Sequence, residues 1–300
     1  MSKLEKIKHA EVGENLSPCQ VNENNVEKVT NFITTWIGEY VQNKPIETLV
    51  LGVSGGVDSA LVSTLCAKTG LPTILVEMPI GTNNEGDRAK RHIEWLKSNY
   101  TNVSSVTVDL TETYNSIRQP LNDINLPTSD EQFEFTMVNT RARLRMTTLY
   151  GIAGQTKGIV VGTGNRVEDF GIGFYTKYGD GGVDISPIGD LIKSEVRVLA
   201  KHVGINNEIL NAQPTDGLHE DGRTDEDQIG ATYKELEWAM EYVDDYTYDF
   251  NGKVMFDDKE VYLLNEREKE VLAIYMSFNR NNKHKMEPIP VCGLPSNLFN

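Results

Sequence analysis

The amino-acid sequence predicts an α/β protein with a mostly parallel, twisted sheet, helices on both faces of the sheet, and a helical C-terminal extension. Two observations predict this fold. Short apolar, β-branched runs alternate with segments of helical periodicity through the first half of the chain, as they do in βα units. Glycine-rich turns at residues 54–56 and 162–164 directly follow two of these runs. Ligands of parallel sheets bind beyond the carboxyl ends of the strands, so we expect both turns at one edge.

The N-terminal residues lead into a helix. Residues 1–22 are polar with weak periodicity, and we expect an irregular arm there. Apolar side chains then recur at helical spacing over residues 26–41, and Asn24 with Glu27 three residues later is a typical N-cap signal. Residues 43–45 end this predicted amphipathic helix.

Apolar runs and periodic segments then alternate along the chain. The runs predicted as strands are residues 48–53, 73–78, 103–110 and 158–162. The segments predicted as helices are residues 60–67, a segment through Ile93 and Leu96, a short helix from Thr111, and residues 133–153. Residues 119–131 contain two prolines, and we expect them to form a connection.

The second half of the chain is less regular. Residues 171–193 show little periodicity but carry many side chains that can bind or react. Residues 213–226 form a polar loop, and with residues 81–88 they are expected to be mobile and to become ordered over bound ligands. The chain is predicted to be helical again from Asp227, with an apolar stripe over residues 261–278.

The stretch SGGVDS, residues 54–59, has the features of an anion site. Two adjacent glycines between a strand and a helix allow positive φ and leave no Cβ in the way of a ligand. The free N–H groups of the turn and of the helix N-terminus then favour phosphate. Ser54 and Ser59 add hydroxyl donors, and Asp58 can hold a cation beside the phosphates. The spacing matches neither the Walker phosphate loop nor GxGxxG.

Composition limits the class of protein. A hydrophobic content of 39% is ordinary for a soluble globular chain of 300 residues, and the formal net charge of −15 argues against a large nucleic-acid surface. The three cysteines, Cys19, Cys66 and Cys292, form no CxxC pair, which is typical of a reducing cytosol. No apolar run has membrane-spanning length and the N-terminus lacks a signal-peptide core, so we expect a cytoplasmic protein that does not contact a membrane.

The SGGVDS stretch resembles the pyrophosphate loop of the N-type ATP pyrophosphatases, which transfer AMP to an acceptor. Within that superfamily the chain is similar to the NAD synthetases. The resemblance runs from about residue 25 to 291, and the stretches that carry it, besides SGGVDS, are NTRARLRM at 139–146, VVGTGNRVEDFGIGFYTKYGDGGVDISPIGDLIKSEV at 160–196, QPTDGLHEDGRTDEDQIGATY at 213–233 and HKMEPIP at 284–290. It implies an adenine nucleotide alpha hydrolase-like, Rossmann-like fold. It also implies a single domain over residues 23–291, after the arm at 1–22 and before a tail at 292–300.

The resemblance implies a ligase that makes NAD from deamido-NAD, as the last step of NAD biosynthesis. ATP is the co-substrate, an acyl-adenylate is the intermediate, and AMP and pyrophosphate are released. Mg²⁺ is implied as cofactor, and a homodimer as the active form, with the dinucleotide bound at the subunit interface. The chain has no room for an N-terminal glutaminase domain, so we expect ammonia, free or supplied by a separate protein, as the nitrogen donor.

The resemblance also implies roles for individual residues. The positions expected to bind ATP are Gly52, Val53, Ser54, Gly55, Gly56, Val57, Asp58, Ser59, Thr163, Lys193 and Thr215. The positions expected to bind deamido-NAD are Arg143, Lys177, Asp184, His284 and Lys285. Asp58 and Glu168 are the expected Mg²⁺ ligands, and Asp58, Lys193 and Asp184 the expected catalytic residues. The segment from Glu168 to Lys177 is one residue longer than the family pattern, which leaves Asp169 as an alternative metal ligand.

Two rival interpretations stay open. One is another adenylating enzyme of the superfamily, such as a tRNA-modifying thiolase or a lysidine synthetase. The acidic balance and the missing CxxC pair both count against it. The other is a nucleotide-binding regulator without catalysis, which the presence of both Asp58 and Glu168 disfavours.

Overall fold

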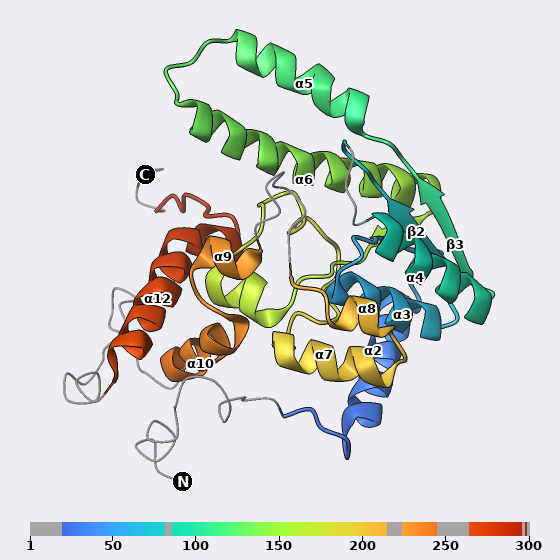
Figure 1. The fold of residues 1–300 in the computed structure, drawn as a ribbon. Coiled ribbons are helices and arrows are strands. Elements are labelled where there is room, and N and C mark those ends of the chain that lie inside the picture. The colour runs from blue at the N-terminus through green and yellow to red at the C-terminus, as the bar shows by residue number, and fades with distance from the viewer. Residues whose placement is uncertain (1–19, 82–85, 215–223, 245–263, 296–297, 299–300) are drawn as a thin grey trace.

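The computed structural model describes residues 20–81, 86–214, 224–244, 264–295 and 298. Four parallel strands form one sheet in the order β3-β2-β1-β4 (Figure 1). They are β1 (Thr48–Gly52), β2 (Thr73–Glu77), β3 (Val103–Thr107) and β4 (Gly158–Val160). Since β1 lies inside the sheet with β4 on its other side, the chain reverses its direction of winding there, and such a switch point is where parallel sheets bind ligands.

Helices cover both faces of this sheet, as the sequence predicts (Figure 1). One face packs against α2 (Val26–Val41), α3 (Val57–Lys68) and α7 (Lys193–His202), and the other against α6 (Asp130–Gln155). Leu49 and Leu51 of β1 face the side of the sheet that α3 covers, whereas Val50 packs with Ala153 of α6 on the opposite side. The alternation along one strand therefore fills both layers with β-branched and leucine side chains.

The remaining elements extend this body. The helices α4 (Gly86–Asn99) and α8 (Asn207–Leu210) pack beside α3, and α5 (Thr111–Asp123) pairs with α6 in a long hairpin that projects from the sheet (Figure 1). A second core unites the π-helical segment η1 (Arg166–Ile172) with α10 (Tyr233–Asp244) and α12 (Glu266–Met286). The short helix α9 (Asp225–Ile229) precedes α10.

Three sequence predictions differ from the structure. The residue that precedes α2 as its N-cap is Asn25, whose side chain accepts a hydrogen bond from the Asn22 backbone, and not Asn24. The predicted connection at residues 119–131 is helical as far as Asp123, with Pro120 inside α5. Proline gives no N–H to the carbonyl four residues earlier, but that residue, Ser116, is exposed, so water can bind the carbonyl instead.

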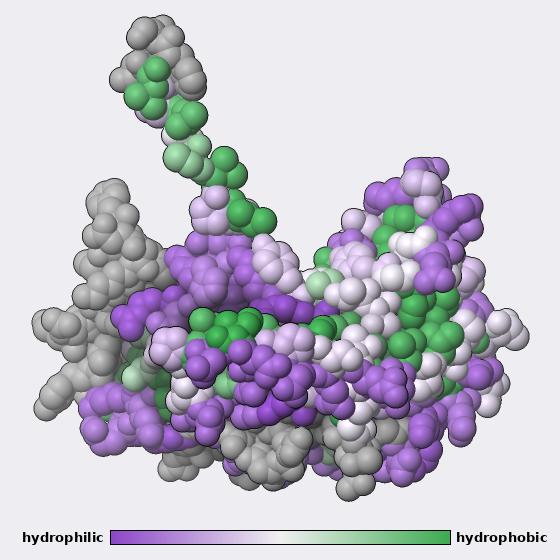
Figure 2. Space-filling model, turned by 90° about the horizontal axis from the view of Figure 1, so that it is seen from above, coloured by the Kyte–Doolittle hydropathy of each residue, from purple (hydrophilic) through white to green (hydrophobic). Residues whose placement is uncertain are grey.

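The third difference concerns the C-terminal part of the chain. The helix there runs from Glu266 to Met286, so it continues beyond the predicted apolar stripe and contains His284 and Lys285. Residues 261–263 of the stripe lie outside the described residues. After α12 the chain leaves the body as an extended segment whose apolar side chains, Ile289, Val291 and Leu294, are exposed (Figure 2). Within the residues that the structure describes, none of the helices combines the length and the apolar composition that a bilayer crossing needs.

Candidate active site

The glycine turn after β1 has the geometry of an anion-binding loop. Gly55 has φ +87°, a conformation that side chains with a Cβ rarely adopt, and Gly56 is the N-cap of α3. The hydroxyls of Ser54 and Ser59 lie 3.1 Å apart, and Ser59 Oγ accepts the Ser54 backbone N–H at 3.2 Å. The turn is therefore held by its own serines, with the N-terminus of α3 behind it.

A second turn follows β4 and begins the π-helical segment. Asn165 is the N-cap of η1, and its Oδ1 accepts the Glu168 backbone N–H at 3.2 Å. Gly164 is required here because a Cβ at this position would come within 1.9 Å of Asp169 Oδ2. The turn contains Thr163, which is half-buried, and it places Glu168 and Asp169 in the first turn of η1.

Three charged side chains from distant parts of the chain meet between these turns. Lys193, the first residue of α7, donates from Nζ to Asp58 Oδ2 at 2.7 Å and to Glu168 Oε1 at 2.8 Å. Its side chain is only 4% exposed, and the two carboxylates are 18% and 17% exposed. Asn165 joins them, because its Nδ2 donates to Asp58 Oδ1 at 3.1 Å. We call Asp58, Asn165, Glu168 and Lys193 the lysine cluster.

The charges in the lysine cluster stabilise one another. Burial lowers the pKa of Lys193, but the negative charges of Asp58 and Glu168 outweigh burial and hold that pKa above its ordinary value. Burial raises the pKa of Glu168, but Lys193 outweighs it and the net pKa is lowered. Burial raises the pKa of Asp58, which Lys193 only partly offsets. The neighbouring Asp169 carries a strongly raised pKa, first from burial and then from the charge of Glu168.

The lysine cluster fits a divalent cation. Within the described residues, no three histidine, cysteine or acidic side chains stand together as a ready metal site. Asp58 Oδ2 and Glu168 Oε1 nevertheless converge on one point, which the Lys193 ammonium occupies. Mg²⁺ is commonly bound by one or two carboxylates together with substrate phosphates, so two converging carboxylates beside an anion loop are a suitable donor set.

Four of the five predicted dinucleotide-binding residues form a second group, which we call the dinucleotide cluster. Arg143 Nε of α6 donates to the Lys177 carbonyl at 3.3 Å, and Lys177 Nζ donates to the His284 carbonyl at 2.6 Å. Lys285 Nζ donates to the Gly173 and Tyr175 carbonyls at 2.9 and 2.7 Å. The cations of this cluster are thus held by backbone oxygens of the η1 exit loop and of α12.

The other predicted positions lie elsewhere. Asp184 lies at the edge of β4, where its Oδ2 accepts the Val160 N–H at 2.7 Å. Thr215 and most of the two loops expected to be mobile lie outside the described residues.

Two residues at this site were not predicted from the sequence: Asn165, a member of the lysine cluster, and Tyr233, which lies beside it. Asn165 bridges Asp58 to the backbone of Glu168, and the spacing Asn-x-x-Glu at 165–168 could have indicated it as a helix cap. Tyr233 donates its hydroxyl to Glu168, and nothing in the local sequence distinguishes it from an ordinary apolar position of α10.

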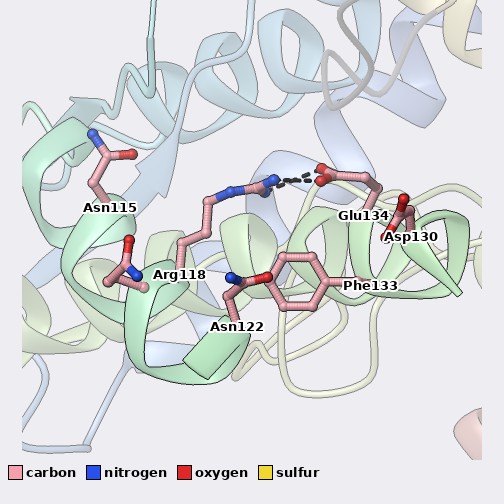
Figure 3. Close-up of a pocket in the computed structure, with 7 residues that line it drawn as sticks. Asn115, Arg118, Asn122, Asp130, Phe133 and Glu134 are labelled. Atoms are coloured by element: carbon pink, nitrogen blue, oxygen red, sulfur yellow. Dashed lines mark hydrogen bonds and ion pairs between the residues drawn. The ribbon is translucent and has the colours of Figure 1, made fainter. Parts of the chain in front are cut away.

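A separate pocket of about 390 Å³ lies between α5 and α6, at the projecting hairpin. Figure 3 shows Arg118 there, paired with Glu134 and close to Phe133. The full lining is Asn115, Arg118, Gln119, Asn122, Asp130, Phe133 and Glu134, and it contains none of the predicted site residues. The candidate active site therefore consists of the two clusters and does not include this pocket.

Comparison with known proteins gives consistent matches along the chain. The family model described as NAD synthase matches residues 29–288. The NH₃-dependent NAD⁺ synthetase of Carboxydothermus hydrogenoformans is 39% identical over 71% of this chain and 84% of the relative. That of Alkaliphilus oremlandii is 35% identical over 90% of this chain and 99% of the relative. Among solved structures, an NMN synthetase from Francisella tularensis aligns with a TM-score of 0.72 and 30% identity over 90% of this chain and 98% of its own.

Proposed function

This chain belongs to the NAD synthase family, and from that premise we propose that it catalyses the ATP-dependent amidation of deamido-NAD by ammonia to give NAD. In the first step the nicotinate carboxylate attacks the α-phosphate of ATP, pyrophosphate leaves, and an acyl-adenylate forms. Ammonia then attacks the activated carbonyl, the C–O bond between the acyl group and AMP breaks, and AMP leaves together with a proton from the nitrogen. The observation that carries the proposal is the convergence of Asp58, Glu168 and Lys193 beside the glycine turn.

The residues of the lysine cluster would carry the first step. The N–H groups and serine hydroxyls of residues 52–59 would hold the phosphates, with Thr163 and Thr215 as further ATP contacts. Asp58 and Glu168 would hold Mg²⁺, which when bound neutralises charge that develops on the phosphates. Lys193 would leave its carboxylates and contact the phosphates, because the bound cation replaces its charge between Asp58 and Glu168.

The dinucleotide cluster would position the acceptor. Arg143, Lys177 and the His284-Lys285 pair present positive charge beside the η1 exit loop, and deamido-NAD carries a pyrophosphate and a carboxylate. Asp184, exposed at the edge of β4, would complete this contact. Asp184 and Asp180, whose Oδ1 accepts the Thr176 backbone N–H, are our two candidates for removing a proton from ammonium. We expect NAD formation to rise between about pH 7 and 8.5, following the supply of neutral ammonia.

One incubation tests the whole proposal. Purified protein with ATP, Mg²⁺, deamido-NAD and ammonium should give NAD and AMP in equal amounts, and glutamine should give no NAD in place of ammonium. Asp58→Asn should abolish AMP release without unfolding the chain, because the neutral amide lacks the negative charge with which the carboxylate binds the cation. Full activity of this variant at ordinary Mg²⁺ would overturn the metal assignment. Pyrophosphate release that requires tRNA would instead support the tRNA-modifying alternative.

A second acceptor is favoured by one specific observation. A solved structure at 30% identity and a TM-score of 0.72 is an NMN synthetase, which favours nicotinate mononucleotide as the second acceptor. The curated relatives that share 39% and 35% identity are NAD synthetases, so the dinucleotide is our first choice. The ratio of kcat/KM for the two acceptors, measured in parallel, decides between them.

We also propose that the active form is a cytoplasmic homodimer. Support comes from exposed apolar side chains in two separate places: Leu121, Ile124 and Phe135 at the α5–α6 hairpin, and Phe32 and Trp36 on α2. Exposed groups of large apolar side chains are typical of protein–protein interfaces. Light scattering at micromolar concentration should give twice the chain mass of 33.6 kDa, and a fully active monomer would refute the assignment.

A further inference from the structure

Tyr233 contacts two of the three charged side chains of the lysine cluster, Glu168 and Lys193, from the C-terminal lobe, by which we mean α9, α10 and α12. It is the first residue of α10 and is buried. Its ring lies against Lys193, whose Nζ is 4.6 Å from the ring centroid. Its hydroxyl donates to Glu168 Oε1, the same oxygen that accepts from Lys193. One side chain of the lobe therefore touches the carboxylate and the ammonium together.

A second carboxylate lies within hydrogen-bond distance of the same hydroxyl, as a further acceptor for its proton. Tyr233 Oη lies 3.1 Å from Asp225 Oδ2, at the first residue of α9. The Tyr233 backbone N–H donates to Glu226 Oε1 at 2.9 Å, so α9 fixes both the backbone and the side chain of this residue.

The helix that carries Tyr233 is packed into a core that it shares with η1. Leu236 and Ala239 of α10 are fully buried in the second core, together with Val167 and Ile172 of η1. The helix that carries Tyr233 and the segment that carries Glu168 are thus packed against each other on the far side of the hydroxyl contact. A shift of Glu168 Oε1 would have to break this contact or move α10.

We propose that Tyr233 is a positioning residue that acts through Glu168. Under the proposed function, Lys193 leaves Glu168 Oε1 when the metal and nucleotide bind. Tyr233 then remains on that oxygen and keeps the carboxylate oriented toward the cation. Hydrogen-bond partners behind a metal ligand fix its orientation, and their loss commonly costs about 10- to 100-fold in metal affinity.

Tyr233→Phe removes only the hydroxyl and keeps the ring over Lys193. The matched control is Tyr242→Phe, another buried tyrosine on α10, which packs against Trp238 in the second core. We would measure Mn²⁺ binding by electron paramagnetic resonance in the presence of a non-hydrolysable ATP analogue, together with the Mg²⁺ dependence of the NAD-forming rate. Tyr233→Phe should weaken Mn²⁺ binding and raise the half-saturating Mg²⁺ by about tenfold, with the KM for ammonium unchanged. Tyr242→Phe should leave both within about twofold of wild type.

A double-mutant cycle separates positioning from a general loss of stability. If Tyr233 acts through Glu168, adding Tyr233→Phe to Glu168→Gln should weaken Mn²⁺ binding no further. Additive losses, or unchanged Mn²⁺ binding in Tyr233→Phe, would overturn the inference. The metal-binding arm needs neither deamido-NAD nor ammonium. Wild-type protein that binds Mn²⁺ and the analogue but makes no NAD would therefore count against the proposed function and not against the role of Tyr233.

Discussion

The lysine cluster and the dinucleotide cluster hold their cations in opposite ways. Lys193 is almost fully buried and lies between two carboxylates. Arg143 is exposed and Lys177 is half-exposed, and their nitrogens contact backbone carbonyls. The first arrangement balances full charges inside the protein, whereas in the second Arg143 and Lys177 donate to neutral backbone carbonyls.

This difference indicates how each cluster would respond to its ligand. A buried ion triad must exchange one cation for another, because uncompensated charge in the interior is costly. An exposed cation on a carbonyl can turn to an anionic ligand at little cost, since a neutral hydrogen bond is exchanged for a charge-assisted one. We therefore expect substitutions in the first cluster to affect both folding and catalysis, and those in the second to affect mainly acceptor binding.

The largest effect is expected for Lys193→Met, which removes the central cation. ATP cleavage should fall by about 10³-fold or more, and the free energy of unfolding by about 3 kcal/mol, because Asp58 and Glu168 repel each other in a buried site. In this variant the pKa of each acid in the folded state would lie above its value in the unfolded state. The variant should therefore be more stable below the unfolded pKa and should lose that stability as pH rises through the folded pKa. Melting at pH 5 and 7 measures this. In this variant Mg²⁺ alone should also raise the melting temperature more than in wild type, and equal responses would contradict the exchange of cations.

Arg143→Ala should have the next largest effect, on acceptor binding alone. The KM for deamido-NAD should rise about 10- to 100-fold, since one charge-assisted contact is lost, while ATP-dependent steps keep their metal requirement. Arg141→Ala is the control on the same helix, because the Arg141 guanidinium stacks on Tyr114, 4.9 Å from its ring centroid. Steady-state kinetics of both variants measure the contrast. Similar KM values for the two would remove Arg143 from the dinucleotide cluster.

Within the dinucleotide cluster, Lys285→Met should be the exception and lower stability more than acceptor binding. Its Nζ donates to two carbonyls of the η1 exit, so the variant should lose about 1–2 kcal/mol in the free energy of unfolding. Urea unfolding measures this, with Lys177→Met as the comparison, whose single carbonyl contact is exposed and should contribute less. A larger loss for Lys177→Met would reverse our assignment of which lysine supports the loop.

The smallest effect concerns salt. Raising the ionic strength from about 0.05 to 0.5 M should increase the KM for deamido-NAD severalfold, because exposed charges are screened beyond about one Debye length. The melting temperature should fall little over the same range if the lysine cluster contributes as a buried group, which is screened much less. Thermal melts and kinetics on one salt series compare the two clusters directly. A steep loss of melting temperature would indicate that the lysine cluster behaves as a surface pair.

The sequence predicted the sheet well because its signals are local. Runs such as residues 48–53 and 73–78 are apolar and β-branched. Their predicted boundaries agree with those of β1 and β2 to within one residue. The proline in α5 was predicted to end a helix and did not, since an exposed carbonyl can bind water. The length of α12 was also missed, because its last turns are polar and carry no apolar period.

What the sequence by itself determined is the parallel sheet, the anion loop at residues 54–59, and the residue types that resemble a family of AMP-forming ligases. Only the tertiary structure decided that Lys193 lies between Asp58 and Glu168, which are 135 and 25 residues away along the chain. It also decided that Lys285 holds a loop and that Tyr233 contacts Glu168. The physical reason is that spacing and periodicity record which way a side chain faces within its own element. The partner it meets depends on how separate elements pack, which no local pattern encodes.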